Sequence, residues 1–199
     1  GPIYDLTGIE DFINLKCFYA NEMPIESVDI SNLSKLEEFH LYTNGYLENI
    51  NIGFKPQLAW LDIRDNMLSE LNLSLCPNLK KLNANGHLTS TSSGIEYLGN
   101  ISSLSLLYNN NLEKVYFSNH PIEHLELPNT INLDYLELNN GLLSYLDLSR
   151  APNLSELSIH SDQPGLLQSI NLSENNQLYK LRISNQPFLT CVEVPNFIY

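Results

Sequence analysis

Large apolar residues recur along this chain with a short, fixed spacing. In the pattern L-x-x-L-x-L they stand three and then two positions apart, and a new set begins about every ten or eleven residues. Because alternate side chains of an extended segment face the same way, the last two apolar residues of each set point inward on a short strand. Two of the clearest sets are Leu58, Leu61 and Ile63, and Leu133, Leu136 and Leu138.

Two consecutive sets make one repeat of about 21 residues, a length typical of solenoid proteins. One repeat cannot fold alone. Its six or so large apolar side chains each contribute roughly 1.5–3 kcal/mol on burial, whereas ordering its residues costs about 1.5 kcal/mol each. Stacked repeats bury both sides of each apolar layer. The pattern therefore predicts a mostly β solenoid of about nine coils, with the first halves forming one parallel sheet, the second halves a second row of short strands, and little helix.

The repeat at residues 58–68 reads L-A-W-L-D-I-R-D-N-M-L and matches L-x-x-L-x-L-x-x-N-x-L. Asn66 falls at the Asn position, as Asn44 does one repeat earlier, and second halves such as 143–149 carry L-x-x-L-D-L. From about residue 3 to 194 the chain resembles bacterial leucine-rich-repeat proteins of the nested 21-residue type. The resemblance implies a right-handed superhelix of the α/β-type repeat class, a secreted or cell-surface location, and a binding role without catalysis.

The chain departs from this pattern in two ways. Residues 85–111 break the period, so that either a half-repeat is lost or an insertion bulges out. We expect a single array over 3–199, belonging to a longer protein, and we set aside Gly1 and Pro2, which resemble a protease-cleavage scar.

The second departure concerns the Asn position of the repeat. A continuous row of Asn is not expected, because other residues take this position: His87, His120, Gly141 and Asp162.

The composition limits the classes of partner that the chain can be expected to bind. The net charge is −13 over 199 residues, which disfavours nucleic acid and anionic membrane surfaces and leaves basic or neutral partners, sugars included. No apolar run is long enough to span a membrane, so membrane insertion is not expected, and we expect a monomer. The three cysteines cannot all pair within the chain. We expect Cys17, Cys76 and Cys191 to be free thiols, although Cys191 could pair with a cysteine outside this sequence.

One motif invites a catalytic interpretation. His120 to His124 reads H-P-I-E-H and matches the inverted zinc-protease motif H-x-x-E-H, which needs both imidazoles on one helix face. Pro121 disfavours helix, and Ile122 is a core position of the repeat. We therefore expect surface histidines at a turn and on a strand, and we predict no metal, no cofactor and no enzymatic activity.

The outward-facing positions of the first halves form two columns that vary from repeat to repeat. Exposed aromatics beside charged residues are typical of protein interfaces and also suit stacking on sugars, although aromatics on a sheet can simply stabilise cross-strand contacts. The leading hypothesis is a module that binds a protein or peptide on this face; a glycan-binding adhesion module and a structural spacer are the alternatives. The candidate ligand residues are Tyr19, His40, Trp60, Lys81, Lys114, Tyr116, Tyr135, Glu156, Lys180 and Arg182.

Overall fold

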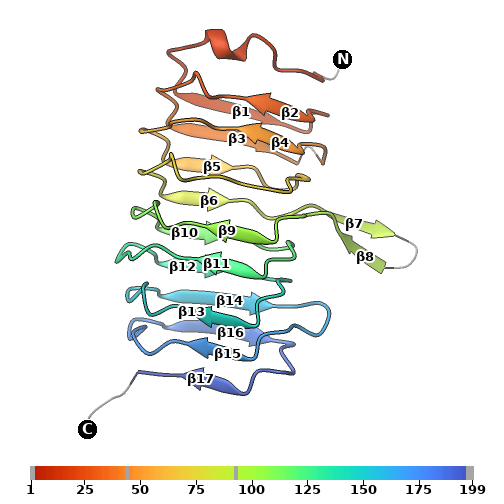
Figure 1. Ribbon diagram of the computed structural model, residues 1–199. Helices are drawn as coiled ribbons and strands as arrows, with labels where there is room; N and C mark the ends of the chain where they lie inside the picture. The colour runs from red at the N-terminus through yellow and green to blue at the C-terminus, as the bar shows by residue number, and fades with distance from the viewer. Residues whose placement is uncertain (1–2, 44, 92–93, 196–199) are drawn as a thin grey trace.

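The computed structural model describes residues 3–43, 45–91 and 94–195, so Gly1, Pro2 and Asn44 lie outside the described residues. The chain is a parallel β-solenoid of about eight turns (Figure 1). Across these ranges the only helix is the single 3-10 turn η1 (Ile9–Asp11), and no helix is long and apolar enough to cross a membrane. The predicted leucine-rich-repeat-like fold with little helix is confirmed.

One parallel sheet of eight strands runs the length of the stack, with one strand from each coil. This is one fewer than the nine coils expected. The strands follow in chain order: β1 (Cys17–Asn21), β3 (Glu38–Tyr42), β5 (Trp60–Asp62), β6 (Lys81–Asn83), β10 (Lys114–Tyr116), β12 (Tyr135–Glu137), β14 (Glu156–His160) and β16 (Lys180–Ser184).

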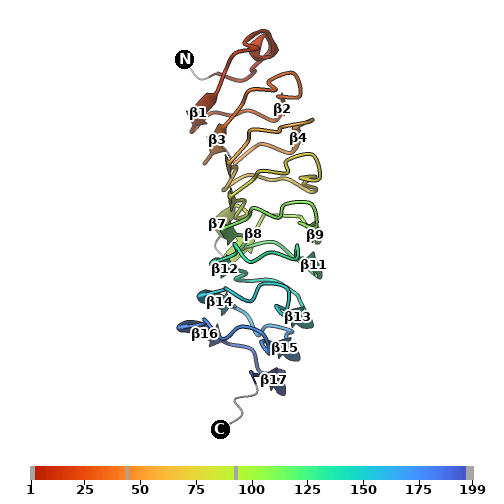
Figure 2. The ribbon, with the colours of Figure 1, turned by 90° about the vertical axis from the view of Figure 1, so that its left-hand side faces the viewer.

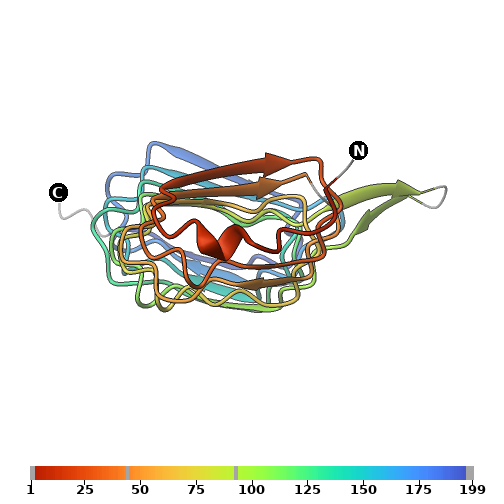
Figure 3. The ribbon, with the colours of Figure 1, turned by 90° about the horizontal axis from the view of Figure 1, so that it is seen from above.

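The second halves form the expected second row, which is interrupted. Figure 3 shows the two rows on opposite sides of the flattened coil, with the core between them. The row consists of three short parallel sheets: β2 (Ser27–Asp29) with β4 (Asn49–Asn51); β9 (Ser103–Ser105) with β11 (His124–Glu126); and β13 (Tyr145–Asp147), β15 (Ser169–Asn171) and β17 (Cys191–Glu193).

The second residue of each large-sheet strand from β3 to β14 points into the core. Phe39, Leu61, Leu82, Val115 and Leu136 follow one another in register, and each is 0% exposed. A slip of one residue would turn this entire row to solvent. Burial of the apolar row therefore fixes which residues face outward on either side of it.

Buried polar side chains close the turns between strands. The Asn66 amide donates to the carbonyls of Leu41 (2.7 Å) and Ile63 (3.0 Å). In second halves a similar row occupies the turn after the strand. It was not predicted, because the residue type changes from coil to coil: Lys55, Asn109, Thr130 and Asn175.

His120 is one of these buried turn residues, which corrects the expectation of a surface histidine. Its Nδ1 accepts from the Ile101 amide at 3.3 Å, so Nε2 carries the proton and donates to the Ala84 carbonyl at 2.8 Å. Burial lowers the pKa of His120 to about 4, and the ring is neutral at pH 7. His124 is exposed on β11. Within the described ranges, no cluster of three His, Cys, Asp or Glu side chains is placed to hold a metal ion.

The irregular segment contains an antiparallel hairpin, β7 (Leu88–Thr91) and β8 (Gly94–Tyr97), which projects from the side of the stack (Figure 1). The chain leaves and re-enters the coil at one point, because the Leu98 amide donates to the His87 carbonyl at 2.9 Å. The following β9 takes its place in the second row. The coil is therefore complete, and the hairpin is inserted into it rather than replacing a half-repeat.

Candidate functional site

The outward residues of the large sheet form two continuous columns, as the repeat pattern predicts. Strand register places all ten candidate residues in these columns. One column reads Cys17, Glu38, Trp60, Lys81, Lys114, Tyr135, Glu156 and Lys180, and the other reads Tyr19, His40, Asp62, Asn83, Tyr116, Glu137, Ser158 and Arg182. Figure 2 shows the stack bending so that this sheet lies on its inner side.

Aromatic rings cross the strands near one end of this face. The Tyr19 and His40 rings stack with centroids 4.5 Å apart, and His40 meets the Trp60 ring edge-on at 4.5 Å. A second pair, Tyr116 and Tyr135, lies with centroids 4.7 Å apart. Such pairs contribute about 0.5–1.5 kcal/mol beyond their burial. The rings are therefore held in place before any partner arrives.

His40 packs beneath the neighbouring rings and offers almost no surface to a binding partner. It was expected to be exposed, but Tyr19 and Trp60 cover its ring, and only 4% of the residue is accessible. Burial lowers the pKa of His40, against the opposing effect of the Asp62 and Glu38 carboxylates. The residue stays neutral at pH 7 and fixes the orientation of the two larger rings.

The acidic side chains in the first part of the face have partners. Asp62 is 4% exposed, and burial raises its pKa, although Arg64, with Nε 3.7 Å from the Asp62 carboxylate, partly offsets this. The Tyr19 hydroxyl donates to Glu38. This hydrogen bond is the main cause that raises the pKa of Tyr19 to about 12.

The acidic side chains further along are satisfied in the same way. Glu137 accepts from the Tyr135 hydroxyl at 2.8 Å and from the Ser118 hydroxyl at 3.0 Å. Glu156 accepts from the Lys180 ammonium at 2.6 Å, and this hydrogen bond is the main cause that lowers the pKa of Glu156. These carboxylates are therefore already stabilised by hydrogen-bond donors from the same face.

A groove of about 730 Å³ follows the middle of the face. Six of the ten candidates line it: Tyr19, His40, Trp60, Lys81, Lys114 and Tyr116. The other four, Tyr135, Glu156, Lys180 and Arg182, line a shallower depression of about 80 Å³ further along the sheet. Sequence reasoning thus names one continuous face, which the structure divides into two hollows.

Seven residues that line the groove are not among the ten candidates: Tyr42, Asp62, Arg64, Leu82, Asn83, Asn85 and Glu137. The Arg64 guanidinium carbon lies 4.6 Å from the centre of the Tyr42 ring. Both residues stand two positions beyond the second column, where the alternation of the strand still places a side chain on the same face. Extending the two columns by one step would have found them.

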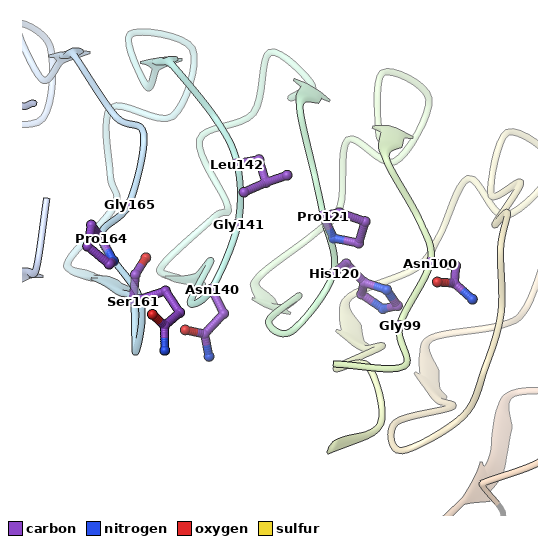
Figure 4. A pocket seen from close by; sticks show the side chains of 11 residues that line it. Gly99, Asn100, His120, Pro121, Asn140, Gly141, Leu142, Ser161, Pro164 and Gly165 are labelled. Carbon is purple, nitrogen blue, oxygen red and sulfur yellow. The ribbon is translucent and has the colours of Figure 1, made fainter. Parts of the chain in front are cut away.

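A third hollow, of about 290 Å³, lies among the turns that follow the large-sheet strands (Figure 4). Its wall consists mainly of turn residues, including Pro121, Leu142 and Pro164. His120 lies at its wall too, but both of its ring nitrogens are already hydrogen-bonded to the backbone. The hollow offers a small apolar surface and no titratable group free to act in it.

One Ser–His–Asp arrangement occurs at the C-terminal ends of β14 and β16. His160 Nδ1 lies 2.8 Å from the Ser184 hydroxyl, and its Nε2 lies 3.2 Å from an Asp162 carboxylate oxygen. The other Asp162 oxygen accepts from Asn140 at 3.2 Å, and Asn140 also donates to Asn119 at 2.9 Å. The contacts thus belong to a polar row that joins successive turns, and we assign them to holding those turns together.

Fold and face together define the class: a parallel, leucine-rich-repeat-like β-solenoid with an aromatic and charged groove on its large sheet. No family model matches the chain, and no curated protein matches it. Among solved structures, the functional domain of InlJ from Listeria monocytogenes, which includes a cysteine ladder, aligns with a TM-score of 0.45 and 16% identity. The alignment covers 94% of this chain and 52% of that one, so this chain spans about half the length of that neighbour.

Proposed function

We propose that this chain is a non-enzymatic recognition module that binds a protein or peptide. The binding surface is formed by the side chains of the large sheet that point away from the core, on the inner side of the bent stack. We further assign the chain to the nested 21-residue bacterial type of leucine-rich repeat, acting as a secreted or cell-surface protein. The observation that carries the binding role is the groove of about 730 Å³, in which Trp60 and Tyr116 lie half-buried between charged side chains.

The groove has the properties that favour tight association. Trp, Tyr and Arg account for much of the energy at protein interfaces, and Trp60, Tyr116 and Arg64 all line this hollow. Their rings and guanidinium are already packed against neighbours. Binding therefore immobilises few new side chains, which lowers the entropic cost of association.

The test is selection of a displayed random-peptide library on the folded chain. Peptides that use the groove should lose at least about tenfold in affinity, about 1.4 kcal/mol, when Trp60→Ala and Tyr116→Ala are combined. Tyr145→Ala is the matched control, because Tyr145 is an exposed aromatic (51%) on β13 in the second row, and it should leave affinity unchanged.

Three outcomes would contradict the proposal. Selected peptides that bind the Trp60 and Tyr116 double variant as well as the parent would place the binding surface elsewhere. A glycan array that gives reproducible ligands quenching Trp60 fluorescence, while the peptide library yields none, would favour the glycan-binding alternative. Failure of both screens would favour a structural spacer.

A further inference from the structure

Two lysines face each other at the centre of the groove. Lys81 on β6 and Lys114 on β10 are direct register partners in neighbouring strands, and both are half-buried. Like charges placed opposite each other in a sheet are destabilising. This chain has only 10 Lys and Arg against 23 Asp and Glu, so a basic composition does not explain the pairing.

Neither lysine is neutralised by a carboxylate. Among the described residues, ion pairs within 4.0 Å link Lys16, Lys80 and Lys180 to glutamates, but none involves Lys81 or Lys114. The Lys81 ammonium instead lies 5.0 Å from the centre of the Trp60 ring. Lys114 acts on the Glu156 carboxylate only through longer-range attraction, which helps to lower the pKa of Glu156, so among the described residues neither ammonium group has a carboxylate in direct contact.

The hairpin insertion leaves this pairing intact. Lys81 and Lys114 are separated by 33 residues, as are the paired Lys80 and Glu113 beside them, whereas neighbouring strands elsewhere in the sheet are 21 to 24 residues apart. Adjacent strands lie about 4.8 Å apart. That spacing separates the backbones of the two lysines, and their long, flexible side chains can bring both ammonium groups to the oxygens of a single carboxylate, at about 2.7–2.9 Å.

We infer that Lys81 and Lys114 form an anion subsite that binds the carboxylate of an Asp or Glu side chain in the bound peptide. This inference rests on the proposed function. Asn83 lies beside the subsite in the second column and lines the same groove, so its amide can supply a further donor. Trp60 and Tyr116 flank the two lysines, which favours a peptide with an apolar or aromatic residue next to the acidic one.

The experiment compares peptide selections on the parent chain and on a variant combining Lys81→Gln and Lys114→Gln. The parent should enrich peptides that contain Asp or Glu, despite its net charge of −13, and the double variant should lose that enrichment. Lys80→Gln is the matched control, because it removes the same charge from the adjacent residue, which is exposed and pairs with Glu113 at 3.0 Å. It should leave the enrichment intact.

A double-mutant cycle then locates the contact. For one selected acidic peptide, the lysine double variant and the replacement of the peptide acid by its amide should each weaken binding at least about tenfold, and together should weaken it little further. Additive losses would overturn the inference. Peptides that depend on Trp60 and Tyr116 but show no acid enrichment would overturn the subsite and leave the proposed function standing, whereas peptides independent of both features would refute the proposed function itself.

Two further readouts separate peptide binding by the lysines from a structural role and from recognition of an anionic sugar. Lys114→Gln should leave the melting temperature unchanged or raise it, since it relieves repulsion between like charges; a marked fall would assign the lysine a structural role instead. Oligogalacturonate is the anionic sugar probe. If it binds with the same lysine dependence while the acidic peptides do not bind, the partner class named here is wrong.

Discussion

The buried imidazole of His120 should make the stability of this chain depend on pH. The ring has a lowered pKa of about 4 in the folded chain, against 6.5 for the unperturbed side chain, and burial is the main cause. Between these two values the unfolded chain binds a proton that the folded chain does not, so stability rises with pH. The contribution is complete above pH 6.5 and is lost as the pH falls towards 4. One pKa unit corresponds to about 1.4 kcal/mol, so the loss across this window is about 3 kcal/mol.

The perturbation is His120→Asn, which places at this turn the residue type that Asn66 provides at the corresponding turn of an earlier coil. Urea unfolding at half-unit steps from pH 7 to pH 4 gives the free energy of unfolding for the parent and the variant. Carboxylates titrate below about pH 5 in both proteins, so the informative quantity is the difference between the two curves. That difference should shrink by about 3 kcal/mol as the pH falls.

The control is His124→Asn, which changes an exposed imidazole on β11 and should leave the profile of the parent unaltered. NMR titration of the His120 ring protons supplies an independent check, with a midpoint near 4 expected. A His120 midpoint between 6 and 7, or a constant difference between the parent and His120→Asn curves, would refute the buried, neutral imidazole.

Three further outcomes are expected. Leu136→Ala should cost about 2–5 kcal/mol of unfolding free energy, because the Leu136 side chain is 0% exposed. Leu181→Ala should cost markedly less, because Leu181 is 47% exposed on the edge strand β16. Equal losses in urea unfolding would show that the core is misassigned. Asn109→Ala should cost about 1–3 kcal/mol, since its buried amide donates to two carbonyls at 2.9 Å, while exposed Asn110→Ala should cost under about 0.5 kcal/mol. Replacing residues 88–97 with a short Gly-Ser link should preserve a single cooperative melting transition, because loop closure costs little; loss of the transition would make the hairpin part of the core.

The outward columns of the large sheet were predictable because a repeat leaves no freedom of register. Once Leu82 and Val115 are assigned to the core, their neighbours Lys81 and Lys114 must point outward, and stacking then places the two lysines side by side. The outward position of both lysines was predicted correctly even across the irregular segment, where more residues separate one strand from the next. The inference needed only the period of the apolar residues, which is the strongest signal in the sequence.

The exposure of each outward residue could not be predicted in the same way. His40 is buried because rings from the strands on either side fold over it, and that depends on the rotamers of Tyr19 and Trp60. The turn residues Lys55 and Asn109 share a position and both donate to backbone carbonyls, but their residue types differ, so comparing repeats by residue type does not find them. Counting positions from the preceding apolar residue would have identified these turn residues.

The hairpin illustrates how an insertion can lengthen one coil without altering the neighbouring sheet. The period alone could not distinguish a lost half-repeat from an added segment, because both displace the next apolar set by a similar amount. In the folded chain β9 keeps its place in the second row, and the added segment leaves the coil between His87 and Leu98. The two lysines consequently meet across a pair of strands 33 residues apart in sequence. A change in sequence length at the side of the coil thus leaves the sheet continuous, so variation in the hairpin and variation in the groove can proceed independently on one scaffold.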